Sequence, residues 1–230
     1  MVVQKERIWR IGLYLLGMVL LALGITMTAQ AGLGASAIVS VPFTLSRWLG
    51  LNFANLTLIV YCLFVGAEFF IKGKARSWLD LLQIPVSIIF TRFMAVFQLV
   101  IRYESRYLPT DIGMLLAGIV LTGVGAAMTV DMQLIPNPGD GIVSSISLRS
   151  GKPLGLCKNF FDLGCVTVSL VMGALAGNPL LGVGGGTFVS MIAVGRVMAV
   201  FQTAAKERVQ RAAGLECPVE AAAKGLDESA

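Results

Sequence analysis

Residues 134–144 read LIPNPGDGIVS and break two long apolar runs with two prolines, two glycines and a single carboxylate. Proline lacks a backbone donor and glycine loosens the chain, so no helix is expected to run through this stretch. In lipid, a broken backbone is tolerated only where protein buries it or where it lines a cavity. The carboxylate of Asp140 is costly at membrane depth and indicates a pathway or a binding site. A milder copy, LGASAIVS, occupies residues 33–40.

The surrounding chain has the composition of an integral membrane protein. Of its 230 residues, 56% are hydrophobic and only 13% are charged, and the mean hydropathy is +0.81. Several apolar runs are long enough to cross a bilayer. The sequence therefore predicts an all-α polytopic fold with six full spans and two short half-helices. The spans are expected at residues 8–30, 53–71, 78–101, 112–131, 156–176 and 180–204, and the half-helices at 35–50 and 138–149.

The two halves of the chain match each other in order. Residues 92–98, RFMAVFQ, recur as RVMAVFQ at 196–202, and the glycine-spaced run from Gly17 to Thr28 recurs from Gly118 to Thr129. We predict a first repeat over 1–104, a second over 105–205 and a polar cytoplasmic tail over 206–230. If the half-helices re-enter the membrane, the repeats are inverted; if they cross, the repeats are parallel. Their short length favours inversion, while the basic residues of the loops do not decide.

Other classes of function find little support. The net charge of +5 comes from basic residues at the ends of apolar runs, which does not suit nucleic-acid binding. The chain has no histidine, and its four cysteines form no CxxC pair, so no metal and no cofactor are expected. No catalytic constellation is visible, and we predict that the protein is not an enzyme.

Three features together resemble the bacterial YczE/YyaS/YitT family of membrane proteins. They are the glycine-spaced first helix of each repeat, the turns at Leu33–Ser36 and Pro138–Asp140, and the GGGT opening of the last helix at Gly184–Thr187. The resemblance covers residues 8–204, and the short tail favours the YczE-like branch. It implies a multi-pass protein of the bacterial inner membrane and a transport role. The family often carries an acid in both turns, whereas here Ser36 stands opposite Asp140.

A substrate site is predicted between the two broken segments. Asp140 and Asn137 would coordinate the cargo, and further candidates are Ser36, Gly139, Gly185 and Thr187. For Asp140 the alternative is an N-cap that accepts the first amides of the next helix. For the glycine run before Thr187 the alternative is close helix packing.

Charges inside the spans are predicted to couple the two halves. Asp162 could pair with Arg196 within the second half, and Asp140 with Arg92 across the halves. The alternative is a fixed structural ion pair, or an arginine that reaches the interface. Glu68 lies near the end of its span and is expected to reach the interface with little functional weight.

The first functional hypothesis is a transporter of a small molecule or ion, with its site between the broken segments. The alternative is a membrane scaffold or accessory subunit, in which Asp140 is only a cap. The expected partners are the lipid bilayer, the unknown small molecule or ion, and further copies of the chain in a homo-oligomer; nucleic acid is not expected.

Overall fold

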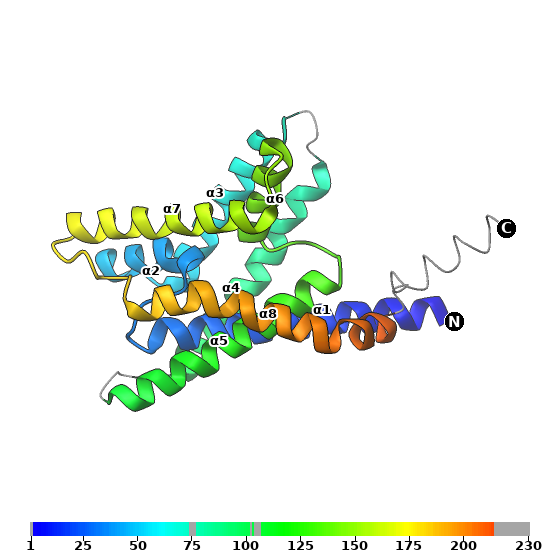
Figure 1. The fold of residues 1–230 in the computed structure, drawn as a ribbon, viewed down its shortest axis with the longest axis horizontal. Helices are drawn as coiled ribbons and strands as arrows, with labels where there is room; N and C mark the ends of the chain where they lie inside the picture. The colour runs from blue at the N-terminus through cyan, green and yellow to red at the C-terminus, as the bar shows by residue number, and fades with distance from the viewer. Residues whose placement is uncertain (1, 74–76, 102, 104–106, 214–230) are drawn as a thin grey trace.

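The computed structural model describes residues 2–73, 77–101, 103 and 107–213 (Figure 1). This part of the chain is helical and contains no β-strand, which confirms the predicted all-α class. The elements are α1 (Val2–Gln30), α2 (Ala37–Leu49), α3 (Phe53–Lys72), the 3₁₀ helix η2 (Trp78–Leu82), α4 (Gln83–Val100), α5 (Leu108–Asp131), α6 (Pro138–Ser150), α7 (Leu154–Leu175) and α8 (Gly185–Ala212).

Six segments are long and apolar enough to cross a membrane, as predicted: α1, α3, η2 with α4, α5, α7 and α8. The two remaining helices, α2 and α6, have 13 residues each. Thirteen helical residues extend about 20 Å, which is shorter than the hydrocarbon core of a bilayer. The chain is therefore a multi-pass membrane protein with six long apolar helices and two short ones.

The second break, between α5 and α6, is held in place by α1. Arg10 donates hydrogen bonds to the carbonyl oxygens of Met132 (2.8 Å) and Gln133 (3.0 Å), and the hydroxyl of Tyr14 donates to the carbonyl of Ile135 (2.8 Å). These side chains satisfy backbone acceptors that the interrupted helix leaves free. The break is thus a fixed part of the fold.

The first break, between α1 and α2, is held by the glycine-rich opening of α8. The amide of Gly186 donates to the carbonyl of Leu33 (2.8 Å), and the amide of Ala35 donates to the carbonyl of Gly182 (3.3 Å). Gly34 has a φ of +103°, and a Cβ there would collide with the backbone of Gly184. Only glycine suits this position, because it combines a left-handed backbone with a close approach of two chains.

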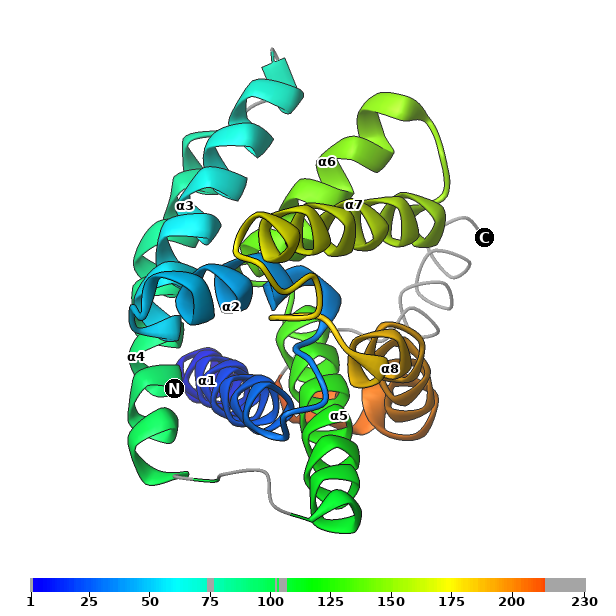
Figure 2. The same cartoon turned by 90° about the vertical axis from the view of Figure 1, so that its left-hand side faces the viewer.

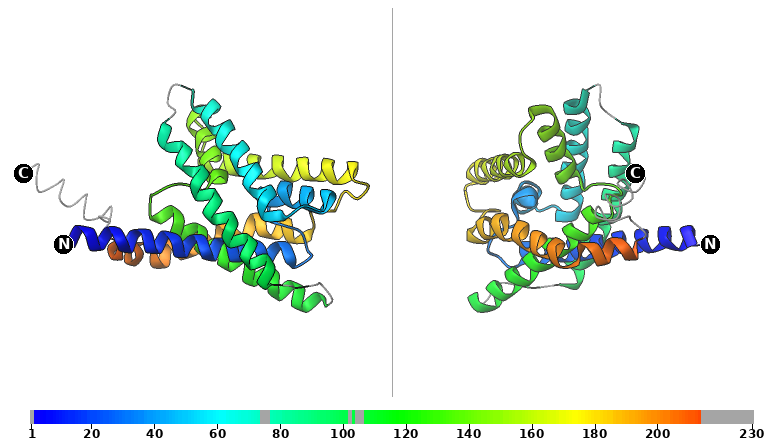
Figure 3. Two further views of the ribbon diagram at one scale, coloured as in Figure 1. Left: turned by 180° about the vertical axis from the view of Figure 1, so that it is seen from behind. Right: turned by 45° about the vertical axis from the view of Figure 1, so that its right-hand side comes forward.

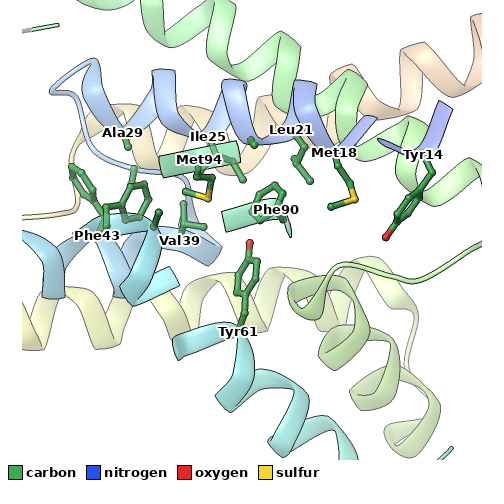
Figure 4. Close-up of a cluster of buried hydrophobic side chains, with 14 of the residues drawn as sticks. Tyr14, Met18, Leu21, Ile25, Ala29, Val39, Phe43, Tyr61, Phe90 and Met94 are labelled. Carbon is green, nitrogen blue, oxygen red and sulfur yellow. The ribbon is translucent and has the colours of Figure 1, made fainter. Parts of the chain in front are cut away.

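The helices pack as a central pair with partners on both sides (Figures 2 and 3). α1 packs along α5, and these two are flanked by α4 and α8 respectively. α2 packs on α7, and α3 packs on α6. The main buried cluster lies between α1, α2, α3 and α4 (Figure 4) and includes Met18, Leu21, Val39, Tyr61 and Met94.

Under the predicted repeat, α1 to α4 correspond to α5 to α8, and among the described residues the contacts α3–α4, α2–α8 and α1–α8 have no counterpart of similar extent. Exchanging the halves turns the α2–α7 contact into α6–α3 and the α1–α4 contact into α5–α8, and all four contacts are present. The α3–α4 contact should return as α7–α8. Instead, α7 and α8 line an open cleft of about 720 Å³. The repeat itself stays a prediction.

The last helix continues past the predicted start of the polar tail. α8 runs without a break from the apolar part of the chain to Ala212. Gln210 and Ala213 are both buried, and Gln210 donates a hydrogen bond to the carbonyl of Asp131 on α5. Gln210 and Ala213 therefore pack against the rest of the protein, while residues 214–230 of the predicted tail lie outside the described part.

Candidate functional site

A central cavity lies where the N-termini of the two short helices meet. Ser36 at the start of α2 and Asn137 and Asp140 at the start of α6 all line it. Gly139 allows the close approach, since a Cβ there would lie 3.0 Å from Cγ2 of Ile38 on α2. The cavity has a volume of about 100 Å³. Two interrupted segments therefore meet at one polar space.

Three charged side chains line the cavity. Nζ of Lys158 lies 3.4 Å from Oδ1 of Asp140, and both side chains are about one-third exposed. Asp162 follows Lys158 by four residues on α7, so the two share one face of the helix. Opposite charges attract Lys158 to both carboxylates. Asp162 is only 4% exposed, and its Oδ1 has no hydrogen-bond partner among the described protein atoms.

Two buried hydroxyls share this property. Ser190 on α8 is 1% exposed and Thr122 on α5 is 5% exposed, and both line the cavity. Neither hydroxyl oxygen has a hydrogen-bond partner among the described atoms. Most buried polar groups in proteins are hydrogen-bonded, so three unpaired polar atoms around one cavity indicate a place where a ligand can bind.

The rest of the lining is largely apolar. Leu21 and Ile25 of α1, Val39 of α2, and Met191 and Met198 of α8 contribute side chains. The Tyr61 side chain points from α3 toward this region (Figure 4) and lines the cavity together with Asn137. Apolar walls with a few polar groups are typical of sites for small organic molecules.

The predicted substrate residues fall into two groups. Asp140, Asn137 and Ser36 lie together at the cavity, with Gly139 packed beside them. Asn137, and not Asp140, is the N-cap of α6, because its Oδ1 accepts from the amide of Gly139 (3.1 Å). The alternative role of Asp140 as N-cap is therefore wrong.

Gly185 and Thr187 lie elsewhere. Gly185 lines a separate cleft, together with Gly34 and Arg47. Thr187 is fully buried, and its Oγ1 accepts a hydrogen bond from the amide of Gly184 (3.2 Å). These residues form the start of α8 and brace the first break, which is the packing role weighed against ligand binding.

Neither predicted ion pair is present in the described part of the chain. Arg92 donates to Oδ1 of Asn55 on α3 (2.7 Å), and Asp140 pairs with Lys158. Arg196 is exposed and lines the α7–α8 cleft, without an ion pair to Asp162. Lys158 is the cation that lies near both carboxylates, because it shares a face of α7 with Asp162 and its Nζ also reaches Asp140. The coupling role of Asp162, Arg92 and Arg196 stays a prediction.

Several residues of the region escaped the sequence analysis. Lys158 could have been recognised from its spacing of four residues to Asp162, whereas no local pattern distinguishes Ser190 or Thr122.

The predicted position of Glu68 at the membrane interface is wrong, because its side chain is buried and only 1% exposed. Its carboxylate contacts Lys72 (2.7 Å), Gln83 (2.8 Å) and Ser145 (3.3 Å). No cluster of acidic or cysteine side chains able to hold a metal occurs among the described residues.

Comparison with known proteins agrees with the membrane architecture. Residues 8–203 match a family described as "Family of unknown function (DUF6198)". The chain is also 24% identical over 196 residues to the "Uncharacterized membrane protein YczE" of Bacillus subtilis (strain 168). The matched stretch covers 85% of this chain and 86% of that protein. No solved structure matches. These matches confirm the YczE-like resemblance, and the chain belongs to the DUF6198 family.

Proposed function

We propose that this protein is a transporter of a small molecule in the bacterial inner membrane, and that the central cavity is its binding site. The observation that carries the proposal is the meeting of three unpaired buried polar atoms, on Thr122, Asp162 and Ser190, in one cavity at the starts of both short helices. Interrupted helices in corresponding places of two halves are typical of transporter binding sites.

The residues that line the cavity would then have different roles in binding the cargo. Asp162, Ser190 and Thr122 are the candidate contacts for the cargo, because each lines the cavity and carries a polar atom without a hydrogen-bond partner among the described residues. Asp140 and Lys158 form an ion pair at its edge that can open when cargo enters, and Asn137 and Ser36 supply further polar contacts. The cavity adjoins the α7–α8 cleft, since Lys158, Asp162 and Met191 line both spaces.

A thermal-shift screen on the purified protein tests the proposal. The panel contains inorganic ions, amino acids, sugars and common metabolites, and the protein is compared with folded Asp140→Asn and Asp162→Asn variants. A ligand stabilises only the state that binds it. A compound that raises the unfolding temperature of the wild type, but not of the variants, supports the site. It should then exchange across the membrane of proteoliposomes in a counterflow assay.

A second candidate, an accessory subunit or homo-oligomer, is favoured by one observation. Only 6% of the apolar membrane-spanning stretch of α8 is buried within the chain, whereas 50% of the corresponding stretch of α1 is buried. Cysteines at Ile192 and Val200, which are 64% and 69% exposed, test this. Cross-linked dimers formed in native membranes, combined with no ligand in the screen, would favour assembly through α8; a monomer with a ligand would favour transport.

A further inference from the structure

The N-terminus of α2 differs from that of α6 in the charge it presents to the cavity. Ser36 makes no capping hydrogen bond with its side chain, and the first turn of α2 contains no acid. The first amides of a helix have no intrahelical partner and carry a partial positive charge. Ser36, Ala37 and Ile38 all line the cavity, so this end of α2 offers free amides to an anionic group.

The N-terminus of α6 is already compensated. Asn137 caps it, Pro138 has no amide hydrogen to offer, and Asp140 places a negative charge in its first turn. Asp140 is in turn paired with Lys158. An anion would therefore be attracted to the start of α2 and not to the start of α6.

On another wall of the cavity, Oδ1 of Asp162 accepts no hydrogen bond from any residue that the structure describes. An ionised carboxylate only accepts hydrogen bonds, so the group that satisfies it must donate. Lys158 attracts this carboxylate without donating to its Oδ1, so the carboxylate still lacks a hydrogen bond, and a cationic donor supplies the strongest one. The hydroxyl of Ser190, which has no hydrogen-bond partner among the described residues, can add one hydrogen bond.

We propose that the central cavity binds a small zwitterion with an apolar body, of the aliphatic α-amino acid class. Its ammonium group donates to Oδ1 of Asp162, its carboxylate accepts from the free amides at the start of α2, and its side chain lies against Leu21, Ile25 and Met191. The inference rests on the proposed function in taking this cavity as the ligand site.

Three compounds with one carbon skeleton test the class on the full-length protein in detergent. L-Leucine has both charged groups, 3-methylbutylamine lacks the carboxylate, and 4-methylpentanoate lacks the ammonium group. We expect leucine to bind and each of the other two to bind at least tenfold more weakly. Equal affinity for the amine, equal affinity for the acid, or no binding of leucine would overturn the proposal.

Variants locate the ammonium group. Asp162→Asn should weaken leucine at least tenfold and leave the weak binding of 4-methylpentanoate unchanged, because that compound has no ammonium group. Asp131→Asn is the matched control: Asp131 is an equally buried carboxylate that hydrogen-bonds to Gln202 outside the cavity, and its replacement should leave leucine affinity unchanged. If Asp162→Asn does not fold, Ser190→Ala takes its place and should weaken leucine several-fold; unchanged affinity would count against the site.

Counterflow of labelled leucine in proteoliposomes separates the two proposals. Binding of leucine without counterflow would keep the ligand class and remove transport. Counterflow of a compound from another class, without leucine binding, would keep transport and overturn the zwitterion. Binding together with counterflow that Asp162→Asn abolishes would support both.

Discussion

Glu68 shows at the scale of one residue how a buried charge joins three helices. It belongs to α3, and its carboxylate contacts Gln83 of α4, Ser145 of α6 and, one turn along its own helix, Lys72. Gly141 makes room for it, since a Cβ there would lie 2.6 Å from Oε2 of Glu68. A buried charge is tolerated because it is both paired and hydrogen-bonded.

Replacing Glu68 by glutamine should lower stability. The change removes the ion pair with Lys72 and leaves a buried hydrogen-bond network only partly satisfied, which costs about 1–3 kcal/mol. The measurement is the thermal unfolding midpoint in detergent. Glu207→Gln is the control, because Glu207 pairs with Arg211 on the exposed end of α8 and should leave the midpoint unchanged. Equal midpoints for both variants would show that the Glu68 network does not hold the helices.

Gly24 is a glycine because the backbone of the neighbouring helix α5 leaves no room for a side chain. A Cβ there would lie 2.5 Å from the backbone nitrogen of Thr122 and 2.7 Å from the carbonyl of Gly118, both on α5. Gly24→Ala should therefore force α1 from α5 and destabilise the protein by about 1–3 kcal/mol. In Gly113→Ala on α5 the added methyl meets no atom of the described residues within 4 Å, so the unfolding midpoint of this variant should match or exceed that of the wild type. Equal unfolding midpoints for the two variants would show that the close contact of α1 with α5 at Gly24 does not contribute to stability.

The short helices were predictable at the scale of the element, because proline and glycine fix where they begin. The half-helices expected at 35–50 and 138–149 correspond to Ala37–Leu49 and Pro138–Ser150. Their supports were not predictable. Arg10 and Tyr14 reach the second break from more than 120 residues away in the chain, and the glycine run of α8 reaches the first. Local patterns carry no information on such distant pairs, and for the same reason the ion pair between Lys158 and Asp140 was not predicted.

Caps at the starts of α6 and α3 separate stability from ligand binding. Asn137 caps α6 at the cavity, and Asn52 caps α3 away from it, accepting from the amide of Asn55 at 3.2 Å. Each change to alanine should cost about 1 kcal/mol of stability. Only Asn137→Ala should also weaken the binding of a cavity ligand, as measured by titration calorimetry. Equal loss of ligand affinity in both variants would show that α6 contributes no polar contact and that the effect is general loosening.

At the scale of the whole molecule, the α3–α4 contact of the first half is the most extensive contact that the second half does not repeat among the described residues. In the first half, Arg92 bonds to Asn55, and Tyr61 stacks on Phe90 with ring centroids 6.0 Å apart, so α3 and α4 stay together. The positions 104 residues later hold Arg196 and Asn159 at the open α7–α8 cleft, with the smaller Cys165 and Val194 in place of the stacked rings. The cleft therefore lies between α7 and α8, where the pairs that join α3 to α4 are replaced by smaller or separated side chains.

A transporter built from two such halves should also close α7 onto α8, bringing Arg196 to Asn159 as Arg92 lies against Asn55. Paired cysteines at 159 and 196, in a background without the native cysteines, should therefore be joined by a short bifunctional thiol reagent in membranes, as should the control pair at 55 and 92. Cargo that bridges Asp162 of α7 and Ser190 of α8 draws these helices together, so a cavity ligand should raise the yield at 159 and 196. Cross-linking confined to 55 and 92, with or without ligand, would mean that the cleft is a permanent opening and that the halves do not exchange conformations.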